Sequence, residues 1–224
     1  MAALTAAFHV RHDLFRDKNE PLSDNADRSS IIASNIMYAA EDEFASGDRR
    51  LRLTHRLMAQ ELVRLCARFV GQSAVAFNAS PTPSATLSDI KRSLLEGYRV
   101  LGPASDGELF RALGFHLGSE RLAAIEFSTL DRFLHERFPS FVSMAEEETG
   151  PFDFPLYSWI STHTVVEVDH FEYGLLAAGM AVNTYAGAQL PEGSLLAHIL
   201  EGFVEFVQFQ RVMFDWSENE GAHG

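Results

Sequence analysis

The sequence predicts an all-α protein, a single-domain bundle of six to seven helices. Apolar residues recur every three or four positions through most of the chain, and glycine or proline separates these stretches. No stretch shows the strict alternation of apolar and polar residues that marks a half-buried strand. With 224 residues the chain can bury a stable core, so we expect one domain over residues 1–224 with its core at about 27–216.

Two helices are expected in the first third of the chain. Ser29 or Ser30 can cap the first, whose apolar positions follow directly and which stops at Gly47. Asp48 can open the second, which carries a wide apolar stripe and ends at Gly71. A connection rich in serine, threonine and proline follows this helix.

Four more helices follow from the same periodicity, each ending near glycine or proline. The segment that separates the second and third of them, residues 146–155, holds three glutamates, a glycine and two prolines, and is expected to be an exposed loop. The expected helices cover residues 88–101, 107–138, 157–184 and 194–216.

Composition excludes several classes of function. The chain has 18 Lys+Arg against 31 Asp+Glu, a formal net charge of −13, which disfavours nucleic acid or an anionic membrane surface as partner. One cysteine, Cys66, excludes an internal disulfide framework and an all-thiolate metal site. Because it lies in the apolar stripe of the second helix, Cys66 is expected to be a small buried hydrophobe.

The expected location of the protein in the cell depends on two features that the sequence lacks, a signal peptide and a membrane span. The first residues lack the basic start and long apolar run of a signal peptide. The longest uncharged run, Tyr173 to Pro191, is rich in alanine and glycine and contains Asn183 and Gln189, so a closely packed helix inside a core is expected rather than a membrane span. A soluble, cytoplasmic protein is therefore the expectation.

The feature that most indicates chemistry is the motif His163-x-x-x-Glu167-x-x-His170. On a helix each residue advances by about 100°, so steps of four and seven residues return to the same face. Two imidazoles and one carboxylate that converge in this way suit a first-row transition metal such as iron, manganese or zinc. The competing interpretation is ordinary: half-buried histidines are often satisfied by backbone, and a His-x-x-x-Glu pair can be a simple side-chain contact.

A metal site in a bundle also needs donors from other helices. The long helix offers Glu120, which shares a face with its apolar core residues, and His116 one turn before it. Glu126 points about 120° away from Glu120, so Glu120 is the preferred ligand. The second helix offers His55, with Asp48 seven residues earlier on the same face. His116, Glu126 and Asp48 are the weaker candidates, since each has a structural explanation as well.

These residues resemble the haem-oxygenase-like di-metal oxidases and oxygenases, whose scaffold also includes the TenA thiaminases and pyrroloquinoline-quinone synthase. The resemblance covers about residues 48–216 and depends mainly on His163-x-x-x-Glu167-x-x-His170, with Glu120 as the expected middle-helix carboxylate. The family's first core helix normally contributes a glutamate and a histidine. Here His55 fits the histidine, while Asp48 would have to substitute for the glutamate.

The resemblance implies a non-haem di-iron enzyme. It would bind Fe(II), two ions per chain with manganese as the alternative metal, and use O2 to oxidise a small amine or amino-acid-derived substrate by N-oxygenation, desaturation or C–C cleavage. A metal-free TenA-like hydrolase or small-molecule-binding protein on the same scaffold is the alternative. The aromatic last helix predicts a homodimer.

Overall fold

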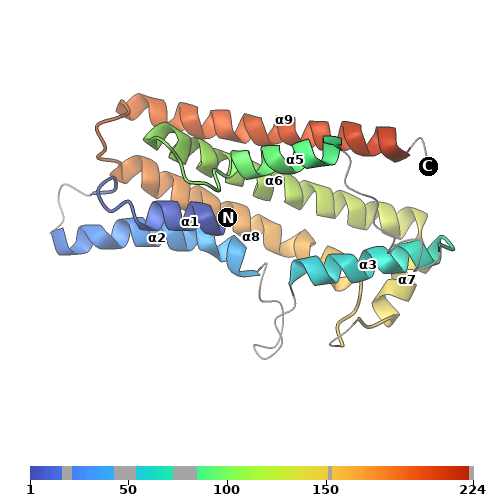
Figure 1. Ribbon diagram of the computed structural model, residues 1–224. Coiled ribbons are helices and arrows are strands. Elements are labelled where there is room, and N and C mark those ends of the chain that lie inside the picture. The colour runs from blue at the N-terminus through green and yellow to red at the C-terminus, as the bar shows by residue number, and fades with distance from the viewer. Residues whose placement is uncertain (17–21, 43–53, 73–84, 151–152, 222–224) are drawn as a thin grey trace. The chain divides into compact units, whose positions relative to one another are not determined.

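The computed structural model describes residues 1–16, 22–42, 54–72, 85–150 and 153–221, and most of these are helical (Figure 1). The all-α prediction is confirmed, and the strand pairing within the described ranges consists of two isolated bridges, Phe15–Tyr185 and Thr149–Pro155. The helices are α1 (Ala2–His9), α2 (Leu22–Asp42), α3 (His55–Phe69), α5 (Ala85–Gly97), α6 (Asp106–Arg137), α7 (Pro139–Glu147), α8 (Ser158–Thr184) and α9 (Leu195–Gly221), with a 3-10 turn, η1 (Glu192–Ser194), before α9.

The described residues therefore contain eight α-helices, more than the six to seven expected. Two of them, α1 and α7, are short and had no predicted counterpart, because eight or nine residues give too little periodicity to detect. Pro139 was expected only to stop the preceding helix. It stands at the first position of α7, where its missing N–H costs nothing.

The expected start of the first long helix is wrong. Ser29 and Ser30 were expected to be its N-cap, but α2 begins at Leu22, about two turns earlier. Ser29 is fully buried within the helix, and its hydroxyl contacts the ring of His12 instead of capping backbone N–H groups. A serine that bonds to another segment thus looks like a cap in the sequence.

Contacts divide the chain into two compact units. The first comprises Met1–Ala39, Ser84–Leu122 and His170–Gly224, and the second comprises Ala40–Pro83 and Ala123–Asp169. Two of the dividing points fall within α6 and α8, each of which is one continuous helix. The prediction of a single domain over residues 1–224, with a core at about 27–216, stays a prediction.

The core of the first unit depends on close approach between α6 and α9. A Cβ at Gly114 would lie 1.8 Å from the carbonyl oxygen of Ile199, and a Cβ at Gly202 would lie 1.8 Å from that of Arg111. Gly118, one turn beyond Gly114, faces Phe206 in the same way. Only glycine permits this separation, so α6 is held tightly against α9 just before it reaches Glu120. Figure 1 also shows α5 lying beside α9.

The second unit has its own apolar cluster, formed by one face of α3, by α7, by residues 154–157 before α8 and by the first turn of α8. Thr54 caps α3 by accepting a hydrogen bond from the N–H of Leu57, so the helix starts at His55. The prediction that Cys66 is a small buried hydrophobe is wrong, because the residue is exposed. The cluster contains Met58, Leu62, Leu65, Phe141, Val142, Ala145, Phe154, Leu156, Tyr157 and Ile160.

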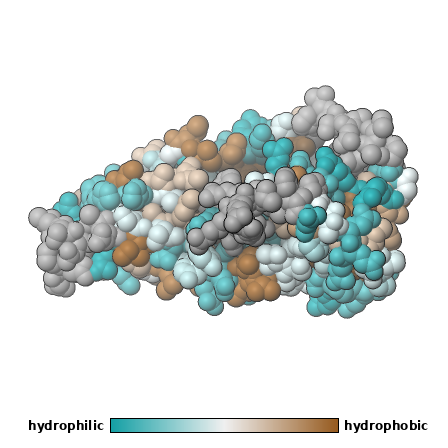
Figure 2. All heavy atoms as spheres, turned by 90° about the horizontal axis from the view of Figure 1, so that it is seen from below, coloured by the Kyte–Doolittle hydropathy of each residue, from teal (hydrophilic) through white to brown (hydrophobic). Residues whose placement is uncertain are grey.

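The surface matches the composition. On the face seen in Figure 2, hydrophilic residues are mixed with small apolar patches. Among the described helices, none combines the length and the apolar character needed to cross a bilayer. The small-residue part of α8 is packed as expected: Ala177 and Ala181 are fully buried, and a Cβ at Gly174 would meet the side chain of Leu117 at 2.8 Å.

Candidate metal centre

Helix α6 carries Glu120 on its most buried stretch. Every residue from Ala112 to Gly118 is buried, and Glu120 itself is only 5% exposed. Acidic residues begin α6 and basic residues end it, which suits the helix dipole over its 32 residues. The sequence therefore builds a long, stable helix that carries a carboxylate into the interior.

Helix α8 supplies the motif predicted from the sequence. His163, Glu167 and His170 are 3%, 5% and 3% exposed, whereas Val165 and Val168 between them are 66% and 46% exposed. The predicted sharing of one buried face is confirmed. Steps of four and three residues along one continuous helix put the three side chains on successive turns.

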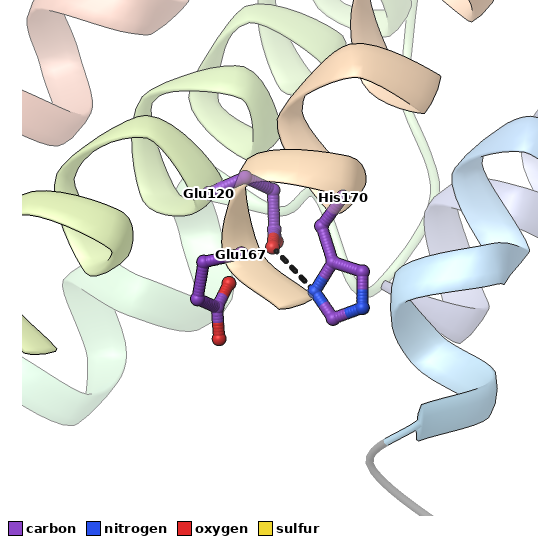
Figure 3. Close-up of side chains that lie close together, drawn as sticks. All are labelled: Glu120, Glu167 and His170. Carbon is purple, nitrogen blue, oxygen red and sulfur yellow. Dashed lines mark ion pairs between the residues drawn. The ribbon is translucent and has the colours of Figure 1, made fainter. Parts of the chain in front are cut away.

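Glu120, Glu167 and His170 come together as one group, which we call the carboxylate group (Figure 3). One ligand atom from each lies within 4.8 Å of the other two, and all three residues are buried. His170 Nδ1 lies 3.4 Å from Oε2 of Glu120. The Tyr38 ring, from α2, packs against His170 with the two ring planes inclined by 78° and their centroids 5.7 Å apart.

The chemistry of this donor set fits a metal ion. Two carboxylates that lie this close in a buried place repel each other when both are ionised, and each also loses its hydration. One imidazole carries at most one positive charge, so it does not fully compensate two ionised carboxylates, whereas a divalent cation does. Carboxylate oxygens with an imidazole nitrogen are ligands that iron, manganese and zinc accept.

A second feature, the histidine pair, consists of His55 at the start of α3 and His163 on α8. His163 Nε2 lies 3.1 Å from Nδ1 of His55, and both rings are buried. His163 Nδ1 donates to the carbonyl oxygen of Trp159 one turn earlier, so Nδ1 carries a proton, and in the neutral ring Nε2 then carries the lone pair. Such a contact is how proteins commonly orient a metal-binding histidine.

Aromatic rings hold His163 in this orientation. Phe127 from α6 stacks on the imidazole, with ring centroids 4.3 Å apart and planes inclined by 21°. Trp159 packs edge-on against both His163 and Phe127. His163 Nε2 also lies 3.7 Å from Oε1 of Glu167, one turn further along α8. Aromatic carbon thus covers the face of the imidazole, while its two nitrogens meet polar groups, Nδ1 the Trp159 carbonyl and Nε2 His55 and Glu167.

Of the three weaker ligand candidates, His116, Glu126 and Asp48, the first two lie in different surroundings. His116 is fully buried one turn before Glu120, with Nδ1 3.1 Å from Oε1 of that residue. Glu126 is half-buried, and burial raises the pKa of its carboxyl group, but the carboxylate group contains Glu120 in its place, as the helical angle predicts. Asp48 lies outside the described residues.

Sequence reasoning missed Tyr38 as a residue of the site. In the sequence it is one of the apolar positions of the first expected helix, and in the structure the residue is 40% exposed with its ring packed against that of His170. It also packs against Tyr173, the residue one turn beyond His170, with centroids 4.2 Å apart. No spacing rule connects α2 with α8, so only the fold could place Tyr38 there.

Comparison of this chain with protein-family models, with curated proteins and with solved structures finds no match. What can be said of its function therefore comes from its own residues.

Proposed function

We propose that this protein is a non-haem, iron-dependent oxidase or oxygenase that binds its metal at Glu120, Glu167 and His170. The observation that carries the proposal is the meeting of two buried carboxylates and a buried imidazole on α6 and α8. The histidine pair, with Nε2 of His163 directed away from its own helix, would supply nitrogen ligands for a second metal ion.

The residues of the chain would each contribute a distinct property. Glu120 and Glu167 supply the negative charge that favours a divalent cation, and His170 adds a neutral nitrogen donor. Bound iron supplies the redox chemistry with O2 that protein side chains lack. Phe127 and Trp159 pack around His163 and exclude water from its ring face. A small amine as substrate, with O2 as co-substrate, is proposed from the family resemblance.

The metal-free alternative, a TenA-like hydrolase, would use Glu120 as an acid or base and a cysteine as nucleophile. Cys66 does not suit that role. It lies on the exposed side of α3, and partial burial of its thiol raises the pKa, which disfavours the thiolate. The two candidates differ most simply in whether the protein binds metal.

The test loads metal-free protein with Fe(II) in the absence of O2 and counts the iron bound per chain. O2 is then added while the visible spectrum is recorded. We expect about two irons per chain if both the carboxylate group and the histidine pair bind, and a change in visible absorption when O2 arrives. Glu120→Ala and His163→Ala should each lose iron while the helical content stays unchanged.

His198→Ala provides the matched control, because His198 lies on α9 beside Glu201 in a similar histidine–carboxylate contact. It should bind as much iron as the parent protein. If the parent protein binds no iron, or if Glu120→Ala and His163→Ala together retain it, the proposal is wrong and the metal-free alternative gains support. One iron per chain would leave the histidine pair without a metal of its own.

A further inference from the structure

The two oxygens of the Glu120 carboxylate have different surroundings. Oε2 faces His170 at 3.4 Å. Oε1 faces the other way, toward its own helix, where Ser119 Oγ lies at 3.2 Å and His116 Nδ1 at 3.1 Å. All of these residues belong to the first unit, on α6 and α8.

Ser119 does not act alone. Its hydroxyl lies 2.7 Å from the carbonyl oxygen of His116, and Tyr98 Oη, just beyond the end of α5, lies 2.7 Å from Ser119 Oγ. Ser119 has one proton, and both of its acceptors, the His116 carbonyl and Glu120 Oε1, require it. The Tyr98 hydroxyl must therefore be the donor to Ser119. A donor bound to Ser119 Oγ polarises its O–H and strengthens the bonds that this O–H makes, the shorter one to the His116 carbonyl and the longer one to Glu120 Oε1.

His116 completes this arrangement. Its ring is fully buried, and within the described residues neither ring nitrogen makes a hydrogen bond. Burying an unbonded imidazole costs free energy, on the order of 1–3 kcal/mol, so its position beside Oε1 needs an explanation. The ring occupies the space beside Oε1, with Nδ1 3.1 Å from that oxygen, and Tyr98 packs against the neighbouring Phe115 ring with centroids 5.2 Å apart.

We propose that Tyr98, Ser119 and His116 position Glu120 so that it binds the metal through Oε2 alone. Ser119 retains Oε1 on the α6 side through its hydrogen bond, His116 fills the space beside that oxygen, and Tyr98 holds Ser119 in the rotamer that reaches Oε1. The three are positioning residues, since they act on the metal through Glu120. This inference rests on the proposed metal site.

The test measures binding of Co(II) and Mn(II) by the metal-free full chain, with the visible spectrum of the Co(II) form as a second readout. Ser119→Ala and Tyr98→Phe should each weaken binding about tenfold, the usual effect of losing an outer partner of a ligand. The Co(II) spectrum should also change, because Glu120 becomes free to bind through both oxygens. Ser119→Thr keeps the hydroxyl and should restore both affinity and spectrum.

Tyr185→Phe is the matched control for Tyr98→Phe. It also removes a phenol hydroxyl from the first unit, one that bonds to the buried Asp106 near the start of α6, and it should leave the Co(II) spectrum unchanged. If the parent protein binds Co(II) but Ser119→Ala and Tyr98→Phe match it in affinity and spectrum, the positioning role is wrong and the metal site stands. If the parent protein binds neither metal, both proposals fall.

Discussion

The carboxylate group and the histidine pair solve different electrostatic problems, although both are buried. His55 and His163 can be neutral, and they satisfy each other through one hydrogen bond with a second partner in the Trp159 carbonyl. Two ionised carboxylates cannot hydrogen-bond to each other, so Glu120 and Glu167 need a shared proton or a cation between them. The comparison teaches that burial alone does not indicate a metal, whereas two buried carboxylates close together, which repel each other when both are ionised, do indicate one.

Removing one of the two carboxylates should have the largest effect. Glu120→Gln keeps the size of the side chain but deletes one negative charge, so Fe(II) affinity should fall by more than about 100-fold, beyond the loss of an outer partner. The metal-free protein should be at least as stable as the parent, because the repulsion is gone. Thermal unfolding with and without a chelator, together with iron titration, measures both effects.

Glu201→Gln is the control for this substitution, since Glu201 is an exposed glutamate of α9 that pairs with Arg111. It should change neither iron affinity nor the difference in unfolding temperature caused by the chelator. If the Glu120→Gln protein bound iron as tightly as the parent, the negative charge of the carboxylate group would not be what attracts the metal.

Gly118→Ala tests whether the carboxylate group depends on the packing of α6. The added Cβ would lie 2.8 Å from Cβ of Phe206, so α6 or α9 must shift, at a cost of about 1–3 kcal/mol in the free energy of unfolding. Because Gly118 lies two residues before Glu120, metal affinity should fall as well. Denaturant unfolding and Co(II) titration report the two effects.

The matched control is Gly179→Ala on α8, where a Cβ would meet nothing within 4 Å. Alanine suits a helix better than glycine, so this substitution should stabilise the protein by up to about 1 kcal/mol. If Gly118→Ala and Gly179→Ala destabilised the protein equally, the cost at Gly118 would not come from the close approach of α6 and α9.

The histidine pair gives the smallest expected effect, a coupling of about 1 kcal/mol in the free energy of unfolding. In the metal-free protein, His55→Leu or His163→Leu leaves one buried imidazole without its partner. The double variant leaves none, so it should cost less than the sum of the two single variants. A double-mutant cycle by denaturant unfolding measures the difference. Strict additivity would mean that the two imidazoles do not interact.

Much of the fold could be predicted from the sequence, and the reason is length. Helices α6, α8 and α9 span several turns each, so their expected bounds lie within a few residues of the observed ones, apart from the last turn of α9. The start of α2 was mispredicted because serine caps and serine tertiary contacts look alike in a sequence.

The candidate site was predictable only along each helix. Helical angles put His163, Glu167 and His170 on one face and preferred Glu120 to Glu126, and the burial of these residues agrees. They could not show that Tyr38 covers His170 or that Tyr98 reaches Ser119, since these contacts join different helices. Side chains that meet across helices depend on packing, which periodicity within one helix does not contain.

The glycines between α6 and α9 also restrict how this sequence can change over time. Any other residue at Gly114 or Gly202 would place its Cβ 1.8 Å from a carbonyl oxygen of the neighbouring helix. We therefore expect these two positions to accept no substitution, even where surface residues vary freely. Divergent chains with the same architecture should retain Gly-x-x-x-Gly with its second glycine two residues before a middle-helix glutamate. Together with His-x-x-x-Glu-x-x-His on a later helix, that spacing is a signature by which such relatives can be recognised.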